Sequence, residues 1–315
     1  MTALHDIVIQ SHDLAPLTRT KYLRDLDTWV AFAGKDPHDW TRATAQRFYN
    51  SLLQRMKPQS ANRLFASVRY ASSWWAKREN NPALDFAVIQ QATRQRNRAV
   101  RRALEPEEAQ RLIATCNGST PIDLRDRALI VVGLETGMRR MSLGAMQIEQ
   151  LKMAREGYPV ALVPIKGSAG ELYPVPLSDA AIAAITPWRD WLRSKRITKG
   201  PLFRTLPRKV DGRGKLTVDV GPGGLSSSAI YKMIATRADA AGIGHMHPHI
   251  FRHTFITWRM QAGLQPYQVA TITGHKLAGL PGMGALGGYI DASRIANEAR
   301  QSTPTWLNRL ITRRP

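Results

Sequence analysis

The apolar positions in the first part of the chain recur at helical spacing, which predicts three helices. The first passes through Leu26 and Phe32, the second ends where Pro58 stands, and the third begins at the capping residue Ser60. Each predicted helix has an apolar side and a polar side. We therefore expect a small helical bundle at the N-terminus.

The pattern of the rest of the chain predicts helices together with one β-hairpin. Residues 158–166 and 171–177 alternate in the manner of strands around a turn at 167–170. The glycine-rich, charged stretch 209–224 is predicted to be a surface loop. Helical spacing recurs over residues 104–113, 124–134, 180–192, 226–241, 250–261, 266–272 and 292–300. The expected fold class is mainly α with a small hairpin or sheet (α+β).

A break in the helical pattern divides the chain. Asn80-Asn81-Pro82 ends the third helix, and several arginines follow it. At 315 residues the chain is long enough for two domains. We expect one domain over residues 1–95, a basic linker over 96–103, and a second domain over 104–315 that ends in a helical tail.

The net charge points to a polyanionic partner. Lys and Arg number 45 against 24 Asp and Glu, which gives +21 and a pI near 10.8. Nucleic acid is the usual partner of such a surface, and no basic amphipathic stretch suggests a membrane anchor. With one cysteine, Cys116, the chain forms no internal disulfide. Without a signal peptide or a spanning segment, we expect a cytoplasmic, nucleoid-associated protein.

Basic residues of the first domain and the linker are the candidates for contact with DNA phosphates. An ordinary solvated face is the alternative for any one of them. The candidates are Arg19, Lys21, Arg63, Lys77, Arg94, Arg96, Arg98 and Arg101.

Two motifs in the middle of the chain place cations near turns. In Thr136-Gly-Met-Arg-Arg-Met-Ser-Leu143, Gly137 ends a buried helix and Arg139 opens the next, an arrangement suited to phosphate. A capping turn with surface arginines is the alternative. Lys166 stands just before the turn of the hairpin.

Two further motifs place histidines and a tyrosine near the C-terminus. His249 and Arg252 are three residues apart, so they are expected on one helix face. Gly274-His275 is followed by a glycine-rich stretch and then by Tyr289. The histidines at 245, 247, 249 and 253 raise metal binding as an alternative, but they lack cysteine or clustered acids as co-ligands.

In this order, the motifs resemble those of the tyrosine recombinases, the phage integrase family. The resemblance implies a helical core-binding domain followed by a catalytic domain. It also implies a role for each of six residues. Arg139 and Arg252 are the arginine pair, Lys166 is the general acid, His249 and His275 are the two histidines, and Tyr289 is the nucleophile.

One residue and one spacing depart from the family pattern. Ser142 stands where the family often has an acid, three residues after the first arginine. The spacing from His275 to Tyr289 is longer than usual, and the intervening residues 279–288 are rich in glycine. A mobile loop that delivers the tyrosine is expected there.

The resemblance implies a site-specific recombinase or integrase that cuts and rejoins double-stranded DNA through a covalent 3′-phosphotyrosine. It needs neither metal nor ATP, and no other cofactor is expected. Four copies are expected on DNA, with accessory DNA-bending proteins as further partners. The alternatives are a topoisomerase-like or telomere-resolving tyrosine enzyme and a DNA-binding protein of this fold that does not cleave.

Overall fold

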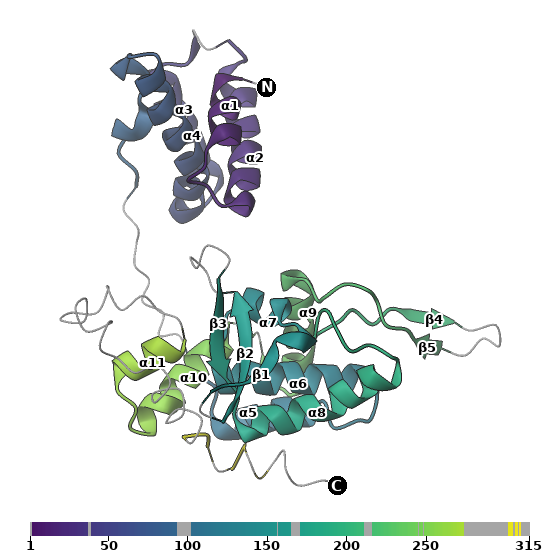
Figure 1. The fold of residues 1–315 in the computed structure, drawn as a ribbon. Helices are drawn as coiled ribbons and strands as arrows, with labels where there is room; N and C mark the ends of the chain where they lie inside the picture. Colours follow the sequence, from purple (N-terminus) through teal and green to yellow (C-terminus); the bar gives the residue numbers. More distant parts are fainter. Residues whose placement is uncertain are drawn as a thin grey trace. The chain divides into compact units, whose positions relative to one another are not determined.

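The structure is a computed structural model in which most of the chain is described. The described residues are 2–36, 39–92, 102–155, 157–164, 171–210, 216–244, 246–247, 249–273, 302–304, 306–307 and 309. The chain divides into two compact units, Met1–Arg98 and Ala99–Pro315 (Figure 1). Each unit has a hydrophobic core of its own. The prediction of a mainly helical chain with a small antiparallel sheet is confirmed.

The first unit is a helical bundle. Its elements are α1 (Ala3–Gln10), α2 (Pro16–Ala33), α3 (Arg42–Arg55), α4 (Pro58–Arg78) and two 3-10 turns, η2 (Pro82–Leu84) and η3 (Phe86–Val88). Helix α4 contacts each of the other three α-helices. Aromatic rings fill the core, where Trp29 makes edge contacts with Trp40 and Phe48 at centroid distances of 6.1 and 5.3 Å.

One helix of this bundle was not predicted, and one predicted helix boundary was wrong. Helix α1 was not predicted, although Leu4 and Val8 are fully buried in the core. Pro58 does not end the second helix. It is the first residue of α4, and Ser60 lies inside that helix. A proline is well placed at a helix start because the amide hydrogen it lacks would have no partner there.

The second unit combines helices with two small antiparallel sheets. Strands β1 (Leu151–Met153), β2 (Pro159–Pro164) and β3 (Leu172–Pro176) form one sheet in that order, and β4 (Arg208–Val210) pairs with β5 (Leu216–Val218) in the other. Its helices are α5 (Pro106–Ala114), α6 (Pro121–Thr136), α7 (Arg140–Ala145), the 3-10 turn η4 (Ile148–Gln150), α8 (Asp179–Ser194), α9 (Ser227–Ala240), α10 (His249–Gln261) and α11 (Pro266–Ile272).

Helix α6 is the centre of this unit. It is buried on all sides from Ala128 to Thr136 and packs against α8 and α10. Thr120 caps its N-terminus by accepting the amide hydrogen of Asp123, and Gly137 ends it in the left-handed conformation. Within the described part of the chain, neither α6 nor any other helix is long and apolar enough to cross a membrane.

The strands differ from the predicted hairpin in two respects. The hairpin of β2 and β3 is present, but β1 adds a third strand at its edge. The stretch 209–224, predicted as a loop, contains most of the β4–β5 pair. These added strands have three residues each, which is too short for an alternating pattern to be recognised.

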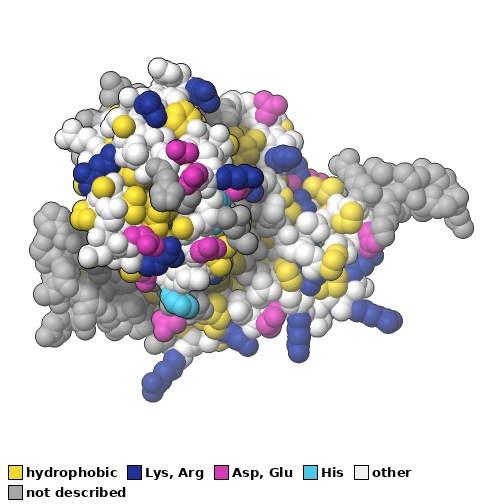
Figure 2. Space-filling model, turned by 90° about the horizontal axis from the view of Figure 1, so that it is seen from above, with side chains coloured by type: hydrophobic (Ala, Val, Ile, Leu, Met, Phe, Trp, Pro, Cys, Tyr) yellow, Lys and Arg dark blue, Asp and Glu magenta, His cyan; other side chains and the backbone are white. Residues whose placement is uncertain are grey.

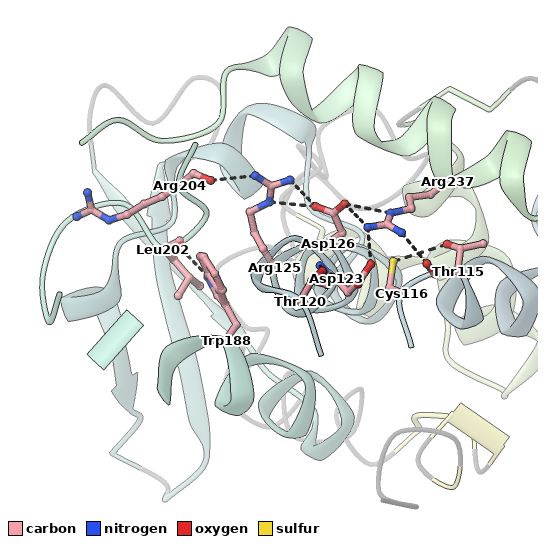
Figure 3. Close-up of polar contacts among 10 residues, drawn as sticks. All are labelled: Thr115, Cys116, Thr120, Asp123, Arg125, Asp126, Trp188, Leu202, Arg204 and Arg237. Atoms are coloured by element: carbon pink, nitrogen blue, oxygen red, sulfur yellow. Dashed lines mark hydrogen bonds and ion pairs between the residues drawn. The ribbon is translucent and has the colours of Figure 1, made fainter. Parts of the chain in front are cut away.

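A buried polar network joins α5, α6, α9 and the chain before β4 (Figure 3). The carboxylate of Asp126 accepts hydrogen bonds from Arg125 and Arg237, and Arg237 also bonds Asp123 at 2.9 Å and the carbonyl of Thr115 at 2.6 Å. Arg125 and Arg237 thus each lie beside a carboxylate, which offsets the cost of removing their charges from water. The ion pairs of this network lie within the protein, so we assign it a structural role.

Candidate active site

A turn after α6 positions the first arginine of interest. The hydroxyl of Thr136 donates to the carbonyl of Val132 at 2.6 Å and accepts from the amide of Met138 at 3.3 Å. Gly137 then reverses the chain at φ 58°, and half-buried Arg139 caps the next helix, α7. The predicted order of helix end, glycine turn and new helix is therefore present.

Gly137 is required for two reasons. Its positive φ favours glycine, and a Cβ at this position would lie 2.7 Å from a ring carbon of Phe255 on α10. The missing side chain lets α10 approach the turn closely. The turn that carries Arg139 is thereby packed against the helix that carries Arg252.

Arg252 is fixed by backbone carbonyls on either side of it. Its side chain is buried, with Nη1 donating to the carbonyl of Gly137 at 3.1 Å and Nη2 donating to the carbonyl of Thr273 at 2.8 Å. These two bonds set the plane of the guanidinium. They also join the turn after α6 to the end of α11.

Arg139 and Arg252 line the same small cavity. The cavity is closed by Ser142 of α7, by Tyr173 and other residues of β2 and β3, and by Thr273. Among the described residues that line it, none is acidic. Burial and then the charge of Arg139 lower the pKa of Arg252 to about 10. Two neighbouring cations without a lining carboxylate form a binding site for an anion.

Ser142 joins the cavity to the hairpin. Its hydroxyl donates to the carbonyl of Pro164 at 2.8 Å, which ties α7 to the end of β2. Pro164 is the last described residue before Lys166, and Thr273 is the last before His275. Lys166, His275 and Tyr289 themselves lie outside the described residues. Thr273 lines the cavity, whereas Pro164 is joined to it through the bond from Ser142.

His249 is not among the described residues that line the arginine cavity. It is the first residue of α10, exposed, with its ring stacked on that of His247 at 5.4 Å. Together with His247, His253 and Arg102 it lines another cavity. The expected common face of His249 and Arg252 does not bring these two side chains into one cavity, because the first is at the exposed start of the helix and the second is buried.

Neither metal ligation nor thiol chemistry gains support from the described residues. Among them, no three or more His, Cys, Asp or Glu side chains are grouped to hold a metal ion; His245 lies outside them. Burial raises the pKa of the Cys116 thiol to about 11, so this cysteine is a poor nucleophile at neutral pH.

Comparison with known proteins identifies the family. Residues 102–278, more than half of the chain, match the model of the phage integrase family. The chain belongs to this family. The tyrosine recombinase XerC of Haemophilus influenzae is 26% identical over 287 residues, covering 87% of this chain and 89% of the relative. The tyrosine recombinase XerD of Caulobacter vibrioides is 27% identical over 272 residues and covers 82% of each chain.

Solved structures agree with the family in their fold. The XerH site-specific recombinase bound to palindromic difH substrate, a post-cleavage complex, matches with a TM-score of 0.62 at 17% identity over 94% of this chain and 83% of that one. A lambda integrase tetramer bound to a Holliday junction matches with a TM-score of 0.62 at 15% identity, covering 92% and 74%. The prediction of a tyrosine recombinase that breaks and rejoins DNA is confirmed at the level of the family.

The basic residues predicted to bind DNA differ in whether they already contact other groups of the protein. Arg63 pairs with Asp25 at 3.1 Å, Arg19 donates to the carbonyl of Ser11 at 2.6 Å, and Lys77 lies over the ring of Trp74. Lys21 is exposed, whereas Arg94, Arg96, Arg98 and Arg101 lie outside the described residues. On the face seen in Figure 2, Lys and Arg side chains are dispersed, with Asp and Glu among them.

The sequence did not predict that backbone carbonyls take part in this integrase-family site. The carbonyls of Gly137 and Thr273 hold Arg252, but a carbonyl leaves no trace in a sequence. Nor did the sequence predict the structural use of Arg42 and Arg69, which donate to the carbonyls of Pro82 and Ala87. A surplus of arginines in the sequence therefore overstates the number available to DNA.

Proposed function

We propose that this integrase-family chain is a site-specific recombinase that cuts double-stranded DNA through a covalent 3′-phosphotyrosine. In this proposal the second unit is catalytic, and the first is the DNA-binding, core-binding domain. One observation carries the proposal: Arg139 and Arg252 line a single cavity without an acidic residue among its described lining. A pair of neighbouring guanidinium groups suits the scissile phosphate.

The arginine pair would stabilise charge that develops during the reaction. A phosphodiester under attack gains negative charge on its non-bridging oxygens, and guanidinium groups can donate two hydrogen bonds each to such oxygens. Arg252 is already oriented by the carbonyls of Gly137 and Thr273, so little reorganisation is needed. A positively charged protein site would thereby do what metal ions do in many nucleases.

The remaining assignments follow the chemistry of strand cleavage. The hydroxyl of Tyr289 attacks the phosphorus, its proton passes to His249, and the bond from phosphorus to the 5′ oxygen breaks as Lys166 donates a proton to that oxygen. His275 hydrogen-bonds the phosphate. The products are a 3′-phosphotyrosine and a free 5′ hydroxyl. Attack by a 5′ hydroxyl of the partner strand reverses these steps, so no ATP is needed.

The assembly is proposed from the relatives. The lambda integrase match is a tetramer on a Holliday junction, which supports four copies acting on two DNA sites. The basic residues of the first unit, together with Arg94, Arg96, Arg98 and Arg101, would contact the DNA backbone. The enzyme would act in the cytoplasm, on DNA of the nucleoid, with DNA-bending proteins as helpers.

The experiment compares cleavage with binding in variants of the arginine pair. Arg139→Ala and Arg252→Ala should each slow cleavage by roughly 10²–10³-fold, with DNA affinity nearly unchanged, because both side chains act on transition-state charge. Arg140→Ala is the matched control, since Arg140 is the neighbour of Arg139 but does not line the cavity. Equal losses of affinity and rate would make the pair simple phosphate anchors and contradict the proposal.

A further inference from the structure

A buried ion pair joins α6 and α10 behind the arginine cavity. Arg259 Nη2 donates to Glu135 Oε2 at 3.1 Å, and the two side chains are 2% and 0% exposed. Taking both charges out of water is costly, and apolar residues often replace such pairs without loss of stability. The pair is therefore better explained by what it holds in place than by its contribution to stability.

What it holds is a short stretch near the C-terminus. The hydroxyl of Thr303 donates to Glu135 Oε2 at 2.6 Å, and Arg259 Nη1 donates to the carbonyl of Ser302 at 2.6 Å. Just beyond, Leu307 is fully buried in the core of the second unit and Trp306 makes an edge contact with Trp258. Ser302, Thr303, Trp306 and Leu307 thus dock on their own unit. We call Glu135, Arg259 and Thr303 the C-terminal clamp.

Two arginines of helix α10 bind the chain on either side of residues 274–301. Arg252 bonds the carbonyl of Thr273, just before residues 274–301, and Arg259 bonds the carbonyl of Ser302, just after them. The two arginines are seven residues apart, which is two helical turns and about 10 Å along the axis. Tyr289 lies within the stretch whose two ends are held this way.

The clamp also contacts the packing that positions Arg139. Glu135 directly precedes the turn at Thr136 and Gly137, and the guanidinium of Arg259 lies 5.0 Å from the ring centroid of Phe255. That same ring fills the space left by the missing side chain of Gly137. The C-terminal clamp and the turn that carries Arg139 are therefore packed against the same ring, that of Phe255.

We propose that Arg259, held by Glu135 and Thr303, is a positioning residue for Tyr289. The clamp holds Ser302 and Thr303 against α6 and α10 and so fixes the point to which the chain returns after Tyr289. A fixed return point would favour placement of the tyrosine hydroxyl near the phosphate. The inference rests on the proposed role of Tyr289 as nucleophile. The clamp itself touches neither DNA nor a reacting atom.

The test removes one hydroxyl from the clamp. Thr303→Val keeps the shape of the side chain but loses the hydroxyl's bonds to Glu135 and Arg259, whereas Thr303→Ser keeps the hydroxyl. The probe is a nicked duplex made from the DNA that flanks the gene, at saturating concentration. Thr303→Val should form the covalent adduct about 10- to 100-fold more slowly, since small misplacements of a reacting group have effects of that size. Its affinity for the duplex should stay within about twofold of the unchanged chain, and Thr303→Ser should restore the rate.

A buried threonine of α10, Thr254, separates positioning from stability. Thr254 is fully buried, and its hydroxyl accepts the amide hydrogen of Leu104, so Thr254→Val likewise removes a buried, hydrogen-bonded hydroxyl. Thermal unfolding of both variants measures that loss. If adduct formation falls equally in the two variants, or stays unchanged in Thr303→Val, the clamp does not position the tyrosine. If Tyr289→Phe still forms the adduct, the proposed nucleophile is wrong, which is a separate failure.

Discussion

Replacing Gly137 with alanine tests how closely the catalytic turn and α10 are packed. The left-handed conformation at φ 58° costs a residue other than glycine roughly 1–2 kcal/mol. The added Cβ would lie 2.7 Å from the ring of Phe255, and overpacking of this kind costs about 1–3 kcal/mol more. We expect Gly137→Ala to destabilise the second unit by about 2–5 kcal/mol.

Gly242 provides a matched control. It has a similar positive φ of 64°, but a Cβ added there meets no atom within 4 Å. Gly242→Ala should therefore show the conformational cost alone, roughly 1–2 kcal/mol. Hydrogen exchange of the slowest amides in α6 and α10 measures the opening free energy of the second unit directly, without assuming that the whole chain unfolds in one step.

The double variant identifies the contact responsible. In Gly137→Ala combined with Phe255→Leu, the smaller side chain leaves room for the new methyl group. The two substitutions should then be less damaging together than the sum of their separate effects. If Gly137→Ala costs no more than Gly242→Ala, or if the two effects simply add, the ring of Phe255 does not constrain the turn and the packing argument is refuted.

Two further predictions concern metal and DNA. Cleavage should persist in excess EDTA, because Arg, Lys and His side chains are assigned the work of a metal; activity that EDTA abolishes and magnesium or zinc restores would contradict this. DNA binding should weaken steeply with salt, as expected for a chain of net charge +21, and the intact chain should bind more tightly than residues 1–95 or 104–315 alone. A shallow salt slope, or a fragment that binds as tightly as the whole, would count against two units acting on one duplex.

The sequence was informative where a local pattern determines a local structure. Helix α11 begins at Pro266 and ends at Ile272, as predicted, because a proline marks its start and apolar spacing continues to its end. Gly137 was recognised as a helix end from its position after an apolar helix. Motif order was enough to identify the family, since residue types and spacing carry that information directly.

The parts that were missed depend on contacts between distant residues. Glu135 and Arg259 are far apart in sequence, and neither belongs to a recognisable motif, so their ion pair is visible only once α6 and α10 are packed together. For the same reason, the sequence could not separate Arg69, which bonds the carbonyl of Ala87, from arginines available to DNA. His249 and Arg252 do lie three residues apart on α10, but helical periodicity alone did not tell that the first is exposed and the second buried.

Mapping the covalent adduct tests the central claim most directly. A nicked duplex from the DNA flanking the gene is incubated with the chain, and the DNA-linked peptide is identified by mass spectrometry. We expect a 3′-phosphate bound to Tyr289, and no adduct with Tyr289→Phe, which loses only the hydroxyl while still binding DNA. An adduct on another residue, or one that forms with Tyr289→Phe, would contradict the assignment of the nucleophile and with it the proposed mechanism.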